Sequence, residues 1–106
     1  MIKQLIICDA GPIIHLDELE CLTILNFPEI VIPKTVHEEI NNTRLISFDK
    51  YPNLKIVPDP RVPNDILESS KIYELHQGEI MAISIALESK NAILLTDESI
   101  AAIKKV

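Results

Sequence analysis

The sequence predicts a three-layer α/β/α domain with a parallel sheet of about four strands. Three observations support this fold class. Short apolar runs alternate with longer segments of helical periodicity along the chain, a pattern typical of strands joined by crossover helices. Hydrophobic residues make up 47% of the chain and aromatic residues 4%, which predicts an aliphatic core. The length of 106 residues fits one domain over 1–106.

Four short apolar runs are the candidate strands. Each is rich in aliphatic side chains and is followed closely by a proline or an acidic residue. Uninterrupted apolar runs of this length are typical of strands that are covered on both faces. We place the strands at residues 4–8, 30–32, 54–57 and 92–95.

Segments of helical periodicity follow the strands. Proline suits the first turn of a helix, and Pro12 and Pro33 each begin one of the expected helices. Gly78 is expected to break the chain before the most apolar helix, and residues 43–53 favour no single structure. Three prolines predict an extended loop at 58–63. The predicted helices span residues 12–26, 33–42, 64–75, 79–89 and 99–105.

The bulk properties exclude several classes of protein. The net charge of −6 gives no long-range attraction for phosphate backbones, so a nucleic-acid partner would need a local basic patch or a bound cation. Cys8 and Cys21 are expected to be buried, reduced thiols. No apolar stretch is long enough for a membrane span, and the amino terminus does not resemble a signal peptide. We therefore expect a cytoplasmic protein without a membrane partner.

Two aspartates follow strands in equivalent positions. Asp9 comes directly after the first predicted strand, and Asp97 comes one threonine after the fourth. Ligands of parallel sheets gather outside the carboxyl ends of the strands, where the strand order reverses. If the first and fourth strands are neighbours, both carboxylates face one site, and Mg²⁺ or Mn²⁺ is the natural partner. The alternative is that each aspartate only caps the helix that follows it.

Two glutamates could join this pair. Glu39 flanks the apolar face that Val36 and Ile40 form, whereas Glu38 points about 100° away on a helix. Glu79 opens the most apolar helix, where its charge favours the helix dipole. Each glutamate could equally be a solvated or dipole-stabilising residue, and the residue pattern leaves both possibilities open.

Four motifs in order resemble those of PIN domains, in particular the toxin-like VapC proteins of bacteria and archaea. The opening motif resembles the family's first motif, which consists of a strand, an aspartate and a turn of small residues that leads into a helix. The second carries a glutamate three residues after a valine, the third is a Gly-Glu helix, and the fourth is a strand that delivers acidic residues. These motifs are CDAGPIIHL at 8–16, VIPKTVHEEI at 31–40, HQGEIMAISIAL at 76–87 and AILLTDES at 92–99.

This resemblance implies a metal-dependent ribonuclease that hydrolyses phosphodiesters. One or two Mg²⁺ or Mn²⁺ ions would be held by four carboxylates, with Glu98 as a further metal ligand. The resemblance also implies an RNA substrate, a possible antitoxin partner and a homodimer. The four implied catalytic residues are Asp9, Glu39, Glu79 and Asp97.

Three departures from the family pattern stand out. Gly11 replaces a residue that is often Ser or Thr, so a hydroxyl that would order the site is missing. Glu98 stands where a second aspartate is usual, which leaves open whether it or Asp97 is the principal ligand. Relatives typically continue beyond a position like Val106, so we expect the sheet to lack the usual last strand. The alternative function is therefore an impaired or truncated module that binds nucleic acid or protein.

Overall fold

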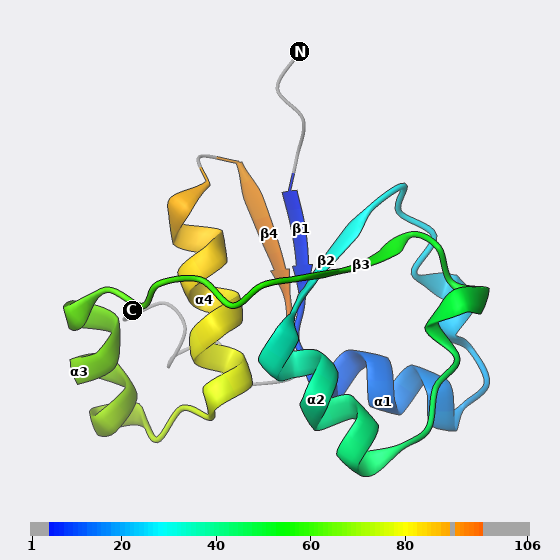
Figure 1. Ribbon diagram of the computed structural model, residues 1–106, viewed down its shortest axis with the longest axis horizontal. Helices are drawn as coiled ribbons and strands as arrows, with labels where there is room; N and C mark the ends of the chain where they lie inside the picture. The colour runs from blue at the N-terminus through cyan, green and yellow to red at the C-terminus, as the bar shows by residue number, and fades with distance from the viewer. Residues whose placement is uncertain (1–4, 90, 97–106) are drawn as a thin grey trace.

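The computed structural model describes residues 5–89 and 91–96 and shows a four-stranded parallel sheet in the order β3-β2-β1-β4 (Figure 1). All three strand pairs are parallel, and the central strands β1 and β2 carry mostly buried side chains. The predicted strands are confirmed to within one residue at their ends. They are β1 (Leu5–Cys8), β2 (Ile30–Pro33), β3 (Leu54–Val57) and β4 (Ala92–Leu95).

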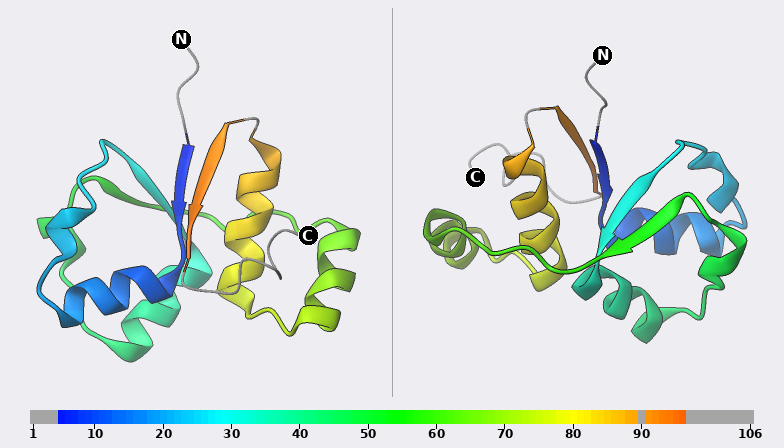
Figure 2. Two further views of the ribbon diagram at one scale, coloured as in Figure 1. Left: turned by 180° about the vertical axis from the view of Figure 1, so that it is seen from behind. Right: turned by 45° about the horizontal axis from the view of Figure 1, so that its top comes forward.

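Helices cover both faces of this sheet and give three layers (Figures 1 and 2). Helices α1 (Ala10–Glu18) and α2 (Lys34–Thr43) pack against one face. Helix α4 (Gln77–Glu88) packs against the other, with α3 (Asn64–Tyr73) on its outer side. The predicted α/β/α class is thus confirmed.

The alternation of side chains along the strands divides the core into two layers. Ile6 and Cys8 of β1 belong to the cluster beneath α1 and α2, whereas Ile7 points to the opposite face and meets Ala82 of α4. Successive strand residues point to opposite faces of a sheet, so a run of apolar residues is stable only when both faces are covered. Both cysteines are free thiols; Cys8 is buried as predicted, but Cys21 is only partly buried.

Helix α1 is shorter than the sequence predicts. The expected helix continued to residue 26, but α1 ends at Glu18 and only a short 3₁₀ turn, Leu22–Ile24, follows. The backbone of Glu20 turns left-handed with φ of 56°, and the Cys21 N–H reaches back to the Leu16 carbonyl at 2.8 Å. This is the hydrogen-bond pattern of a Schellman C-cap, which stops a helix even when apolar periodicity continues.

The start of α4 also differs from the prediction. Gly78 was expected to break the chain, but it lies inside the first turn of a helix that begins at Gln77. Another 3₁₀ turn, Phe48–Lys50, occupies the segment left unassigned, and residues 58–63 form the expected loop. The helix predicted at 99–105 lies outside the described residues. Among the helices that the structure does describe, none is long and apolar enough to span a membrane.

The strand order reverses at one point in the sheet. The chain moves from β1 through β2 to β3 on one side and then returns to β4 on the other side of β1. Helices α1 and α4 both begin at the end of the sheet to which the β1 and β4 arrows point (Figures 1 and 2). The order therefore reverses between β1 and β4, where parallel sheets open a ligand crevice.

Candidate functional site

Asp9 lies at the carboxyl end of β1 and is 5% exposed. Its backbone is extended and continues the sheet, because its N–H donates to the Leu95 carbonyl at 2.9 Å. Its Oδ1 accepts the Ala10 N–H at 2.8 Å, which caps α1. Its Oδ2 accepts the hydroxyl of Thr96 at 3.4 Å. Asp9 is therefore a helix cap, as the alternative proposed, and also carries a second oxygen that faces the end of β4.

The register between β1 and β4 fixes what stands beside Asp9. Cys8 is paired with Leu95, so Thr96 is the residue at the level of Asp9. The two strands are neighbours, which was the condition on which the predicted Asp9–Asp97 pair depended. Asp97 and Glu98 themselves lie outside the described residues. The last described residue of this segment, Thr96, lies beside Asp9.

Glu79 is buried in the first turn of α4 and is 6% exposed. It forms a capping box with His76, in which the imidazole of His76 accepts the Glu79 N–H and the Glu79 Oε1 accepts the His76 N–H at 3.3 Å. The two side chains also approach each other, with 4.0 Å between His76 Nε2 and Glu79 Oε1. The first-turn carboxylate is favoured by the helix dipole, as the sequence allowed.

Glu39 reaches from α2 to the same turn of α4. Its Oε1 accepts the Gly78 N–H at 2.9 Å, and the side chain is half-buried, whereas Glu38 is exposed. The contact is so close that a Cβ on Gly78 would lie 2.6 Å from Oε2 and 2.7 Å from Oε1. Glu39 is therefore the inward-facing glutamate of the pair, and its carboxylate lies against the backbone of α4.

Two contacts hold α2 in place from its ends. At its start, Thr35 donates its N–H at 2.9 Å and its hydroxyl at 2.5 Å to the Asp59 carboxylate. Pro33 precedes α2 and offers no side-chain acceptor, so Asp59 supplies the cap from the loop after β3. At its end, the Arg44 Nε donates to Asp17 of α1 at 2.6 Å. These contacts fix the helix that carries Glu39.

The acidic residues do not form a compact ligand cluster among themselves in the described residues. Within 5–89 and 91–96, no three His, Cys, Asp or Glu side chains come close enough together to hold a metal ion. Asp9, Glu39 and Glu79 all belong to elements that meet at the carboxyl end of the sheet, but Glu39 and Glu79 are engaged with the first turn of α4. The fourth predicted carboxylate, Asp97, lies outside the described part.

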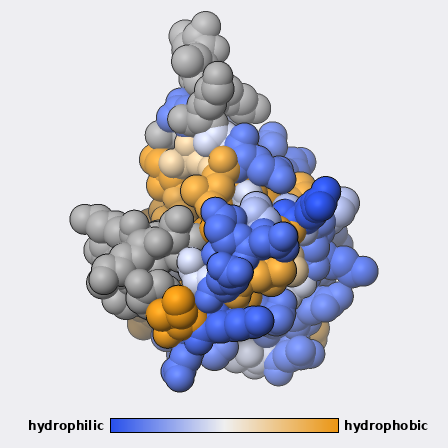
Figure 3. Space-filling model, turned by 90° about the vertical axis from the view of Figure 1, so that its left-hand side faces the viewer, coloured by the Kyte–Doolittle hydropathy of each residue, from blue (hydrophilic) through white to orange (hydrophobic). Residues whose placement is uncertain are grey.

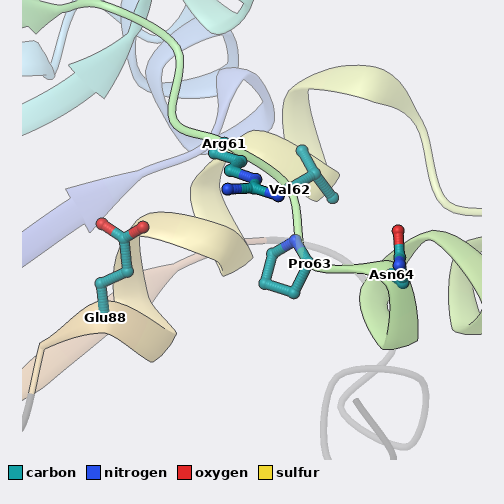
Figure 4. A pocket seen from close by; sticks show the side chains of 5 residues that line it. All are labelled: Arg61, Val62, Pro63, Asn64 and Glu88. Carbon is teal, nitrogen blue, oxygen red and sulfur yellow. The ribbon is translucent and has the colours of Figure 1, made fainter.

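Two hollows on the surface lie away from these carboxylates. One, of about 330 Å³, opens between the start of α3 and the end of α4, where Arg61 and Glu88 come from different elements (Figure 4). The other, of about 390 Å³, lies beside η1 and η2, the two 3₁₀ turns described above, and includes Tyr51 and Lys50. Neither is lined by a predicted site residue, so neither marks the acidic site.

Sequence reasoning missed several residues that build this site. Thr96 was treated only as a spacer before Asp97, although a hydroxyl at a strand end is a ready partner for a carboxylate on the neighbouring strand. Gly78 was taken as a break, yet a glycine directly before the glutamate could have indicated a close approach of another chain segment. The cap by Asp59 had no local signal, because it lies 24 residues from Thr35.

Comparison with known proteins agrees with the described geometry. A search of curated proteins and a search of solved structures gave no match. The model of the DUF3368 family, a PIN domain, matches residues 5–103. The match covers nearly all of the chain and includes every acidic residue that the sequence singles out. The buried Asp9 lies at the reversal point of a parallel sheet, and the family match extends over nearly all of the chain. The chain therefore belongs to the PIN-domain family.

Proposed function

We propose that the protein is a metal-dependent ribonuclease of the PIN type that acts in the cytoplasm as one domain. The observation that carries this proposal is the position of Asp9. Its buried carboxylate lies where the strand order reverses, beside the strand that leads through Thr96 into Asp97. We assign the site to Asp9, Glu79 and Asp97, with Glu39 and Glu98 beside them. The PIN fold, which is of nuclease type, supports the proposal.

The donors present fit Mg²⁺ or Mn²⁺. These ions prefer carboxylate oxygens, and Mg²⁺ commonly uses only one or two protein carboxylates while keeping several waters. Asp9 and Asp97 would meet that requirement without a third carboxylate. A divalent ion, when bound, supplies positive charge beside the phosphodiester and lowers the pKa of a water for attack on phosphorus. A protein of net charge −6 would otherwise repel a phosphate at this edge.

The residues of the chain would prepare the site for this reaction. The Ala10 N–H and the Thr96 hydroxyl fix the two oxygens of Asp9 in one orientation. The capping box with His76 fixes Glu79 at the start of α4. Catalytic groups act best when hydrogen bonds and packing hold them before substrate arrives. Burial of Asp9 and Glu79 keeps both carboxylates from turning freely into solvent.

Cleavage of a mixed-sequence RNA with Mg²⁺ or Mn²⁺ tests the proposal. We expect cleavage that chelation abolishes and that Asp9→Asn reduces at least about a hundredfold. Asp97→Asn should lower the rate more than Glu98→Gln if Asp97 is the principal ligand. Asp49→Asn, an exposed surface change, is the matched control and should retain full activity. Cleavage that continues unchanged in Asp9→Asn would refute the assignment.

We further propose that the nuclease is the toxin of a VapC-like pair and meets a protein partner, either an antitoxin or a second copy. Apolar side chains exposed on the α3–α4 layer support this: Ile72 is 73% exposed and Leu87 is 56% exposed. Figure 3 views the side on which α3 lies, where apolar patches are interrupted by hydrophilic residues. Growth arrest on expression, abolished by Asp9→Asn, tests the toxin proposal. Light scattering of the purified chain tests the dimer proposal separately.

One observation favours a second candidate function. The carboxylate of Glu39 accepts the Gly78 N–H in the first turn of α4, and that of Glu79 accepts the N–H of the N-cap residue His76. A domain in which these groups served only as helix caps could still bind RNA or protein without cleaving it. Calorimetric titration with Mn²⁺ separates the two functions, because a purely structural role for the carboxylates predicts no binding.

A further inference from the structure

Glu39 of α2 contacts the backbone at the start of α4. Its Oε1 accepts the Gly78 N–H at 2.9 Å. Both of its oxygens lie in the space that a Cβ on Gly78 would occupy, at 2.6 and 2.7 Å from that position. Gly78 has no positive φ, so its backbone conformation does not demand glycine. The absent side chain is therefore what admits the carboxylate, and the carboxylate is directed at the backbone of α4.

This contact adds to the cap of α4. The first backbone N–H groups of a helix have no partner within it and need acceptors from elsewhere. The His76 imidazole accepts the Glu79 N–H, and the Glu79 carboxylate accepts the His76 N–H. The Gly78 N–H lies between them in sequence, and Glu39 supplies its acceptor from α2. The positive end of the helix dipole stabilises a carboxylate in this place.

We infer that Glu39 is a positioning residue, which fixes the start of α4 and thereby the place of Glu79, and that it does not ligate the metal. The inference rests on the proposed function. Glu79 directly follows Gly78, so the hydrogen bond to the Gly78 N–H restrains the backbone immediately before Glu79. The metal would then depend on Asp9, Glu79 and Asp97, with Glu39 acting through α4. Mutation of residues that orient metal ligands commonly lowers metal affinity by about 10- to 100-fold.

Two substitutions at one position separate positioning from ligation. Glu39→Gln keeps a carbonyl oxygen that can accept the Gly78 N–H, whereas Glu39→Ala removes it. We would measure Mn²⁺ affinity by calorimetry and amide hydrogen exchange of Gly78 and Glu79 in the metal-free protein. Glu38→Gln, the exposed neighbour, is the control for loss of charge, and Asp9→Asn is the control for loss of a ligand.

We expect Glu39→Ala to speed exchange at Gly78 and to weaken Mn²⁺ binding about tenfold. Glu39→Gln should keep slow exchange and weaken binding less than about threefold, as a loss of nearby charge would. Glu39→Gln could instead abolish Mn²⁺ binding as completely as Asp9→Asn does and leave hydrogen exchange unchanged. That result would identify Glu39 as a direct ligand and overturn the inference. Unchanged exchange in Glu39→Ala would also overturn it.

The same experiment distinguishes failure of the inference from failure of the proposed function. If the unaltered protein binds no Mn²⁺, the metal-dependent nuclease fails at that step. The exchange rates still report on the cap, because they are measured without metal. Slow exchange in Glu39→Gln and fast exchange in Glu39→Ala would then support the fixing of α4 by Glu39 even though the function assigned to the site is wrong.

Discussion

The carboxylate of Glu39 lies against the Cα of Gly78, 39 residues away in sequence, and accepts its N–H at 2.9 Å. The contact joins α2 to the first turn of α4 at the carboxyl end of the sheet. It explains why a glycine stands inside a helix, where alanine would otherwise be favoured by about 1 kcal/mol.

Gly78→Ala should destabilise the protein although alanine is the better helix former. The new Cβ displaces the Glu39 carboxylate and removes a hydrogen bond to a charged acceptor, which is worth about 1.5–3 kcal/mol. The gain in helix propensity offsets about 1 kcal/mol of this loss. We expect a net decrease of about 1 kcal/mol in the free energy of unfolding, measured by urea denaturation.

The combination with Glu39→Ala provides the control for this prediction. Once Glu39 is truncated, the Cβ of alanine at position 78 no longer meets a carboxylate, so only the gain in propensity remains. Gly78→Ala should then be neutral or stabilising in the Glu39→Ala background. An equal loss of stability in both backgrounds would show that the Glu39–Gly78 contact is not the cause.

Thr96→Val should lower the proposed nuclease activity with little effect on folding. The change removes the hydroxyl that donates to Asp9 Oδ2 but keeps the shape of the side chain. We expect kcat/KM for RNA cleavage to fall about tenfold, because partners of a ligand tune its orientation. Thr96→Ser keeps the hydroxyl and should retain most of the activity. Equal activity of the valine and serine variants would remove Thr96 from the site.

Asp59→Ala should loosen the start of α2. It leaves the N–H and hydroxyl of Thr35 without their acceptor, and loss of a helix cap costs about 1 kcal/mol. Chemical denaturation should show this loss, and hydrogen exchange should locate it in the first turn of α2. Asp49→Ala, an exposed aspartate of the η2 turn, is the control for the change in net charge and should leave stability within about 0.5 kcal/mol.

Glu20→Gly should stabilise the protein. Glu20 has a φ of 56° at the end of α1, a left-handed conformation that costs a non-glycine residue about 1 kcal/mol. We expect the free energy of unfolding to rise by roughly this amount in urea denaturation. Glu20→Ala removes the same charge but keeps a Cβ, so it should give no comparable gain. A similar gain from alanine would point to charge as the cause.

The sequence by itself determined the layers of the fold and the edge of the functional site. Uninterrupted apolar runs predicted buried parallel strands because only a sheet covered on both faces can bury every side chain of a strand. Asp9 could be placed at the end of the first strand because that position depends only on where the apolar run stops. The parallel order also identified the carboxyl edge as the place for a ligand.

Only the tertiary structure decided which side chains meet at that edge. The order β3-β2-β1-β4 placed Thr96 beside Asp9, and packing of α2 on α4 brought Glu39 to Gly78. The left-handed Glu20 ended α1 where periodicity alone would have continued it. Local patterns report which face of an element is buried. Contacts between residues far apart in sequence depend on how the elements pack. The glycine at position 78 could indicate a close approach of another segment, but only the packing of α2 on α4 shows that Glu39 makes it.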